Sequence, residues 1–187
     1  MKKSLVLILL FTISGFNLLA QQENEPSPEK HFQLAENALS KDNCSVALWH
    51  INKTIDGKPT DEVYSLRAMI HECLNDFTAA ITDYSVLIHR QPENTEYLFS
   101  RGVLLYRTGQ YQPAIEDLKM SLLLPMEVTN KIYYKVETGE KGISGMSTLK
   151  TMQGEIYNYI GLAYHELNQS DSAIANFSRS ISMGSNP

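Results

Sequence analysis

Histidine is the side chain best suited to metal binding and acid–base chemistry at neutral pH, and the chain has five histidines among 187 residues. They are His31, His50, His71, His89 and His165. They fall in separate segments, and none has the paired spacing of an HExxH or His-x-x-x-His metal site. The sequence therefore predicts no metal site and no histidine-centred catalysis.

Glycine and serine patterns give no sign of a catalytic or cofactor site either. Gly139, Gly142 and Gly145 do not lead from a strand into a helix with the spacing of a phosphate-binding loop. The residues around Ser144 lack the nucleophile-elbow pattern, and no nucleophile, base and acid are suggested by spacing. We expect no cofactor and a protein that is not an enzyme.

The first twenty residues have the pattern of a cleaved secretory signal. Lys2 and Lys3 give a positive start, residues 5–13 are apolar, and Ala20 is a small residue before the expected cut. The apolar run is shorter than the about 20 residues of a membrane span, although an uncleaved anchor is the alternative. We expect export to the periplasm or the extracellular space, with residues 21–26 as a flexible N-terminal segment.

The charge balance bears on the class of partner. Without Lys2 and Lys3 the chain keeps 14 basic and 21 acidic residues, a formal net charge of −7. Such a surface repels phosphate backbones and anionic membranes. We therefore expect neither a nucleic-acid partner nor, after signal cleavage, a membrane span.

The chain repeats itself at an offset of 34 residues. Residues 61–94 and 95–126 superimpose, a third copy occupies 154–187, and a fainter one 28–60. Each copy holds two segments of about 12 to 14 residues whose apolar residues recur every three or four positions, which predicts a helical hairpin of helices A and B. The turn between them falls on residue types that tolerate positive φ, namely Asp42, Asn75, Gly109 and Asn168.

Small residues recur where the two helices of a hairpin must approach closely. In helix A they are Ala35, Ala68, Gly102 and Gly161, and in helix B they are Ala47, Ala80, Ala114 and Ala173. Large residues fill the space around them.

Equivalent positions of the aligned repeats, which we call columns, also predict the orientation of the last helix. It is expected to turn Ile174, Phe177 and Ile181 inward and to expose Ser172, Asn176, Ser178, Arg179 and Ser182.

These columns resemble the tetratricopeptide repeat family, over about 130 residues. The resemblance implies an all-α, right-handed superhelical solenoid of four repeats. It also implies a concave groove, lined by the A helices, that receives a peptide or a partner helix. The predicted groove residues are Phe32, Glu36, Glu62, Met69, Glu96, Phe99, Val103, Tyr106, Asn158 and Leu162.

The groove positions depart from one known use of the family. Members that clamp a C-terminal carboxylate carry lysines, arginines and asparagines there, and this chain has only Asn158 of that kind. Acidic and apolar residues predominate instead. We expect a protein or peptide partner with an apolar or basic segment.

An insertion separates the third and fourth repeats. Residues 127–153 contain a β-branched and aromatic run with alternating polarity, followed by Gly139 and Gly142, and they predict a short β-hairpin or an ordered loop. Residues 147–152 could instead extend the next A helix backwards. An insertion of this length is often functional, but it can also be a tolerated decoration.

The two cysteines fall on helices predicted to be antiparallel neighbours. Pairing residues across the turn at Gly57 to Pro59 aligns Cys44 with Cys73. In an oxidising compartment they could form a disulfide, and two free thiols are the alternative.

These features predict an exported scaffold that mediates protein–protein interaction, an envelope or periplasmic assembly adaptor. Two other functions stay open. The protein could carry an apolar small ligand in its groove, or it could be the accessory subunit of an enzyme whose site includes the insertion.

Overall fold

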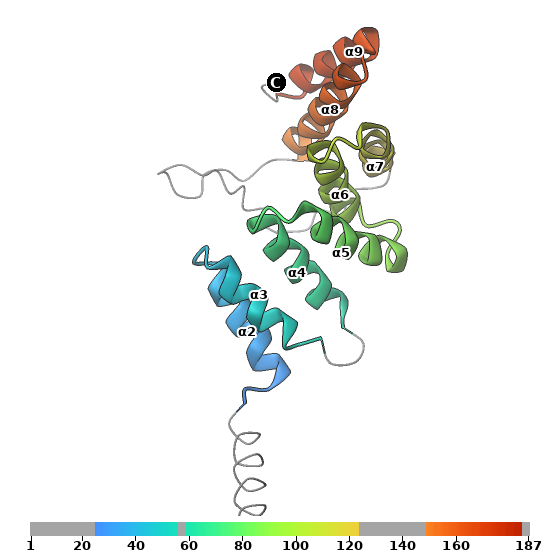
Figure 1. Ribbon diagram of the computed structural model, residues 1–187. Coiled ribbons are helices and arrows are strands. Elements are labelled where there is room, and N and C mark those ends of the chain that lie inside the picture. The colour runs from blue at the N-terminus through green and yellow to red at the C-terminus, as the bar shows by residue number, and fades with distance from the viewer. Residues whose placement is uncertain (1–24, 56–58, 124–148, 185–187) are drawn as a thin grey trace, which may run out of the picture. The chain divides into compact units, whose positions relative to one another are not determined.

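The computed structural model describes residues 25–55, 59–123 and 149–184, in which every regular element is a helix (Figure 1). The helices are α2 (Pro28–Leu39), α3 (Cys44–Asn52), α4 (Asp61–Cys73), α5 (Phe77–Arg90), α6 (Thr95–Arg107), α7 (Tyr111–Leu123), α8 (Leu149–Glu166) and α9 (Ser170–Ser182). The predicted all-helical class is confirmed for these residues. No helix among them is long and apolar enough to cross a membrane.

The chain divides into two compact units at Pro59 and Thr60. In unit 1, α2 and α3 pack as one helical hairpin. In unit 2, three hairpins follow one another, α4 with α5, α6 with α7 and α8 with α9, and α5 and α7 also pack against the A helices that follow them, α6 and α8. Helices α6 and α8 contact each other as well, so that unit 2 is a stack of hairpins.

The four hairpin turns have the backbone geometry that the sequence predicts. Asp42, Asn75 and Asn168 have φ of 55°, 59° and 58°, and Gly109 has φ of 78°. These short polar residues and glycine accept the left-handed conformation at low cost, and they end each A helix where the chain must reverse.

In the α6–α7 and α8–α9 hairpins, a glycine of helix A lies in close contact with a large side chain of helix B. A Cβ atom added at Gly102 would lie 2.8 Å from Leu118 Cγ, and one added at Gly161 would lie 2.7 Å from the ring of Phe177. The helix backbones approach so closely that only hydrogen fits at these two positions.

The core of unit 2 lies between hairpins as well as within them. One buried cluster joins α4, α5 and α6, and a second joins α7 and α8. Their members are Ala68, Ala80, Tyr84, Leu87, Tyr97 and Leu104, and Ile115, Leu118, Ile156, Ile160 and Ala163. A single hairpin would leave these side chains in water, so stacking on the next hairpin completes the core.

Two buried ion pairs recur at the same place in successive hairpins. Arg67 Nε donates to Asp83 Oδ2 at 2.7 Å, and Arg101 Nε donates to Asp117 Oδ2 at 2.7 Å, each pair making a second parallel bond. Asp83 is 2% exposed, and such a carboxylate is tolerated inside a protein only when it is paired. Both pairs join helix A to helix B of their own hairpin. Arg101 Nη1 also donates to Ser85 of the preceding hairpin, at 3.1 Å.

The orientation predicted for the last helix is wrong at three positions. Ile174 and Ile181, expected inside, are 62% and 59% exposed, and Asn176, expected outside, is 7% exposed. Phe177 packs against Gly161, as expected. Ile174 and Ile181 were predicted to be buried because the equivalent residues of the earlier hairpins pack against the next helix. No described helix follows α9.

The predicted insertion is described only at its end. Residues 149–153 belong to α8, which agrees with the alternative that the A helix extends backwards. The described residues contain no strand, so the structure gives no support to a β-hairpin. The segment on which the hairpin was predicted, residues 131–146, lies outside the described residues.

We predict that Gly102→Ala destabilises unit 2 by about 1 to 3 kcal/mol, because the new methyl group must push aside a Leu118 side chain that is fully buried. The higher helix propensity of alanine, worth about 1 kcal/mol, offsets this only in part. Chemical denaturation measures the change. The double variant Gly102→Ala, Leu118→Ala should lose less stability than the two single changes together, and strict additivity would contradict the contact.

A second prediction concerns the cysteines. The described residues contain no free cysteine, and Cys44 and Cys73 are the only cysteines of the chain. Their pairing with each other would link unit 1 to unit 2, and it stays a prediction. Intact mass after alkylation without reductant should show no added groups, and two after reduction. Two alkylated thiols in the unreduced native protein would exclude the bridge.

Candidate functional site

Eight of the ten predicted groove residues lie on the A helices of unit 2, and we call them the A-helix surface. They are Glu62 and Met69 on α4, Glu96, Phe99, Val103 and Tyr106 on α6, and Asn158 and Leu162 on α8. Each is exposed or half-buried, and Met69 is 45% exposed. The other two, Phe32 and Glu36, lie on α2 in unit 1, where Phe32 is half-buried and Glu36 exposed.

An aromatic cluster forms the centre of the A-helix surface. The ring centroid of Tyr159 lies 6.3 Å from that of Phe99 and 5.8 Å from that of Tyr106, both edge to face. Val103 packs against the buried cluster of α7 and α8, and the ring centroid of Tyr111, on α7, lies 5.8 Å from that of Tyr106. Such ring pairs stabilise the contact of α6 with α8 and still leave half-buried rings accessible to a partner.

Sequence reasoning missed Tyr159. The equivalent positions in the other repeats are Gln33, Leu66 and Ser100, so no aromatic column marks this position. The Arg67–Asp83 and Arg101–Asp117 pairs were missed too, although an arginine and an aspartate sixteen residues apart, repeated 34 residues later, could have revealed them.

Carboxylates lie near the ends of the A helices. Asp61 and Glu62 are in the first turn of α4 and Glu96 in that of α6, and after burial their negative charges raise the pKa of Tyr97, on α6. At the other end, burial and then Glu166 raise the pKa of Tyr106. The A-helix surface therefore combines aromatic rings with negative charge near both ends.

Glu72 is a half-buried acid on α4. The hydroxyl of Tyr84 donates to Glu72 Oε1 at 2.8 Å, and Arg107, which stacks over the ring of Phe77, contributes positive charge. Burial nevertheless outweighs both and raises the pKa of Glu72. This group ties α4 to α5 rather than facing a ligand.

The histidines do not gather into one centre. In unit 1, His31 and His50 lie with their Nδ1 atoms 2.9 Å apart, although 19 residues separate them in the chain. Burial, and then His31, lower the pKa of His50. Throughout residues 25–55, 59–123 and 149–184, no three His, Cys, Asp or Glu side chains are placed to hold a metal ion.

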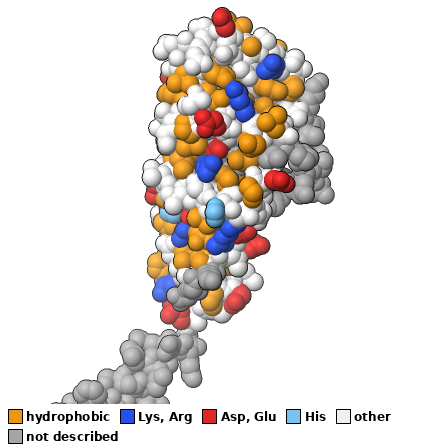
Figure 2. Space-filling model, turned by 90° about the vertical axis from the view of Figure 1, so that its right-hand side faces the viewer, with side chains coloured by type: hydrophobic (Ala, Val, Ile, Leu, Met, Phe, Trp, Pro, Cys, Tyr) orange, Lys and Arg blue, Asp and Glu red, His pale blue; other side chains and the backbone are white. Residues whose placement is uncertain are grey.

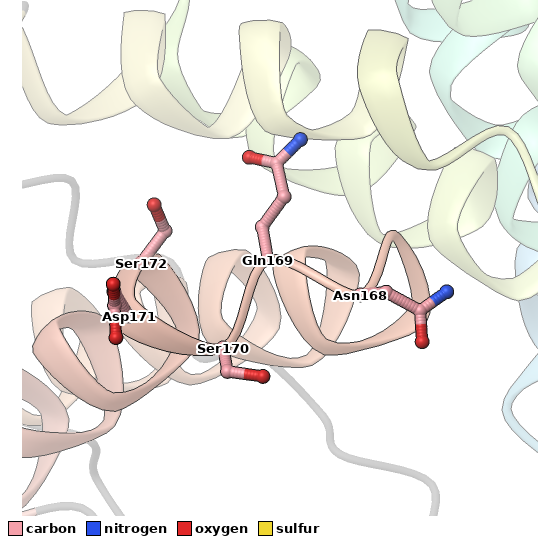
Figure 3. A pocket seen from close by; sticks show the side chains of 5 residues that line it. All are labelled: Asn168, Gln169, Ser170, Asp171 and Ser172. Atoms are coloured by element: carbon pink, nitrogen blue, oxygen red, sulfur yellow. The ribbon is translucent and has the colours of Figure 1, made fainter.

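A small open pocket lies at the turn between α8 and α9 (Figure 3). It is lined by Asn168, Gln169, Ser170, Asp171 and Ser172. Their side chains point in different directions in Figure 3 and do not converge on a common point. On the face shown in Figure 2, lysine and arginine side chains are scattered among hydrophobic and polar ones and form no continuous stripe. Neither feature has the chemistry of a catalytic or a nucleic-acid site.

The raised pKa of the half-buried Glu72 gives a prediction about pH. Its folded-state pKa lies above the ordinary value, so its contribution to stability is fully present below the unfolded pKa and is lost as the pH rises through the folded pKa. Glu72→Gln, which still accepts from Tyr84, should therefore gain stability relative to the natural protein as the pH rises above about 4, the ordinary pKa of glutamate. Denaturation at several pH values measures this difference. Glu116→Gln, at an exposed position on α7, is the control and should show no such trend.

Part of the chain matches a known sequence family. Residues 154–185 match the model described as "Tetratricopeptide repeat". Two human proteins are also similar in sequence. Over 100 residues the chain is 26% identical to "Protein SGT1 homolog", which covers 53% of the chain and 27% of that protein. Over 95 residues it is 28% identical to "DnaJ homolog subfamily C member 3", covering 50% of the chain and 19% of that protein. The chain therefore spans only about a fifth to a quarter of the length of these relatives.

Solved structures of MamA have a similar fold. One, from MSR-1, aligns with a TM-score of 0.66 and 14% identity over 84% of this chain and 77% of MamA. Another, from Desulfovibrio magneticus RS-1, aligns with a TM-score of 0.65 and 14% identity over 84% of this chain and 75% of the other. At this identity the likeness concerns the fold alone. The chain thus has the helical-repeat fold of MamA, and its last hairpin matches a tetratricopeptide repeat.

Proposed function

We propose that this protein is an exported, non-catalytic scaffold that holds a partner protein on its A-helix surface. The observation that carries the proposal is the half-buried aromatic cluster of Phe99, Tyr106 and Tyr159, with carboxylates near both ends of the surface. The tetratricopeptide match of the last hairpin supports a protein-binding role. The signal-like residues 1–20 lie outside the described residues and support export by their pattern alone.

The chemistry of this surface defines the partner. Aromatic rings bury apolar side chains and also attract cations over their faces. Glu166 adds negative charge near Tyr106, and Glu62 and Glu96 add it at the other end of the A helices, near Tyr97. A segment with apolar residues flanked by lysine or arginine satisfies both requirements, whereas an acidic segment would be repelled. Within the cell envelope this protein would therefore act as an assembly adaptor for partners with such a segment.

The alternatives gain less support from the geometry. A carrier of an apolar small ligand needs an enclosed apolar site, and the pocket at the α8–α9 turn is open and lined by five polar residues. An accessory role in an enzyme would depend on the insertion, most of which lies outside the described residues.

The test compares charge reversals on and off the A-helix surface. Residues 21–187 are immobilised, and proteins captured from an envelope extract are quantified for the natural chain, for Glu62→Lys with Glu96→Lys, and for Glu116→Lys as a control on α7. We expect the double variant to lose its basic partners about tenfold, equivalent to about 1.4 kcal/mol, with a larger effect at low salt. The control should capture them normally.

Two readings of this experiment would contradict the proposal. Equal capture by the double variant would place the partner elsewhere, and equal loss in Glu116→Lys would indicate a general charge effect. Since Glu62 and Glu96 lie in the first turns of α4 and α6, lysine there also costs some helix stability. Thermal melting of each variant, and Glu62→Gln with Glu96→Gln, separate this cost from the loss of binding.

A further inference from the structure

Helix α9 presents an apolar stripe to solvent. Ile174 and Ile181 lie seven residues apart, about two helical turns, and are 62% and 59% exposed. Ser178, which is also exposed, lies between them on the same side. We call Ile174, Ser178 and Ile181 the α9 end face. Among the described residues no helix covers these two β-branched side chains, and burying both against a partner would remove apolar surface from water.

The repeat shows what covers this face elsewhere in unit 2. The residues equivalent to Ile174 and Ile181 are Ile115 and Leu122 on α7. Ile115 is 1% exposed in a cluster with Ile156 and Ile160 of α8, and Leu122 packs against the same cluster. The following A helix therefore buries this column in the third repeat.

The second repeat shows the same arrangement. Ile81 and Ile88 of α5 are its equivalents, and they pack against the cluster that contains Tyr97 and Leu104 of α6. In both hairpins of unit 2 that have a described successor, this pair of positions packs against a cluster to which the next A helix contributes; Ile115 is buried, and Ile81, Ile88 and Leu122 are partly buried. In α9 the same residue types stand without such a helix among the described residues.

We propose that the α9 end face binds an amphipathic helix of another protein, which stacks on it as an A helix stacks on the preceding B helix. The proposal continues an interface that unit 2 already makes twice, α5 with α6 and α7 with α8. It concerns a different surface from the A-helix surface, and it does not depend on what that surface binds.

The internal interface also specifies the chemistry of the incoming helix. Helix α8 covers α7 with Ile156, Ile160 and Ala163, which are buried and spaced as i, i+4 and i+7. It also contacts the preceding A helix, α6, through Tyr159. The partner helix should therefore carry large apolar residues at i and i+4, a small one at i+7, and an aromatic next to this column that reaches α8.

A second copy of this chain is a poorer occupant. Its first A helix, α2, has Lys30, Gln33 and Asn37 at the positions of Ile156, Tyr159 and Ala163, and all three are exposed and polar. Helix α2 thus has the polar outer face of a capping helix. In a second α9, the aromatic at i+3 is Phe177, which already packs against Gly161 of its own hairpin, and the residue at i+4 is Ser178, so pairing of two α9 helices would match only part of this pattern.

The test uses helices of this chain as probes. A fluorescent peptide of residues 149–166, stapled outside its apolar column so that it is already helical, is titrated into the intact protein and followed by anisotropy. We expect a Kd below about 1 mM. Ile174→Ser with Ile181→Ser should weaken binding at least tenfold, and Met120→Ser, at another exposed apolar position, should not. A stapled peptide of residues 28–39, with the polar column of α2, should not bind.

Ser178→Arg is a second variant, because it blocks the face sterically and leaves both isoleucines in place. Failure of the 149–166 peptide to bind, or binding unchanged in both α9 variants, would overturn the proposal. Sedimentation of the protein alone supplies the remaining outcome. A dimer that dissociates in both α9 variants would show that a second copy occupies the face and would equally overturn it. Normal capture on the A-helix surface by these variants would show that the proposed function stands apart from this result.

Discussion

The close approach of helix A to helix B is the constraint on which the rest of unit 2 depends. Gly102 and Gly161 let Leu118 and Phe177 pack directly onto the A-helix backbone, and Ala68 occupies the same column in α4. Each hairpin buries the apolar side chains between its own two helices, but its remaining apolar face can be buried only against another hairpin. Stacking of successive hairpins follows from this need, and it brings α4, α6 and α8 together as a surface that a partner can reach.

Much of the fold was predictable because a repeat gives several independent observations of the same local physics. The positive φ of Asp42, Asn75, Gly109 and Asn168 was predicted because the four residues are equivalent and of types that tolerate it. A single residue that differs from its equivalents gives no such signal. Tyr159, which joins Phe99 and Tyr106 into the aromatic cluster, stands where the other repeats have Gln33, Leu66 and Ser100, and the pattern could not reveal it.

The same reasoning explains the error at α9. Equivalent positions in two repeats are buried alike only when equivalent helices pack against them. The helix that packs against Ile115 is α8. For Ile174 the sequence pattern is the same but no described helix follows, so the prediction transferred burial without the helix that causes it. Asn176 and Ser180 are buried because they face α8 within the hairpin, which depends on hairpin geometry and not on polarity.

The buried polar groups show a similar division between repeats. Hairpins two and three each bury an arginine–aspartate pair, and in hairpin four the equivalent residues are Ile160 and Asn176, where Asn176 donates to the carbonyl of Ser172. A buried carboxylate needs its arginine, so the loss of one partner requires the loss of the other. Ile160 instead packs against α7. The last hairpin thus exchanges an internal ion pair for apolar contact with the preceding B helix, and its α9 presents the apolar column that the preceding B helices bury against the hairpin that follows them. The side chains of hairpin four therefore resemble those of a hairpin with another stacked on it, although it is the last hairpin among the described residues.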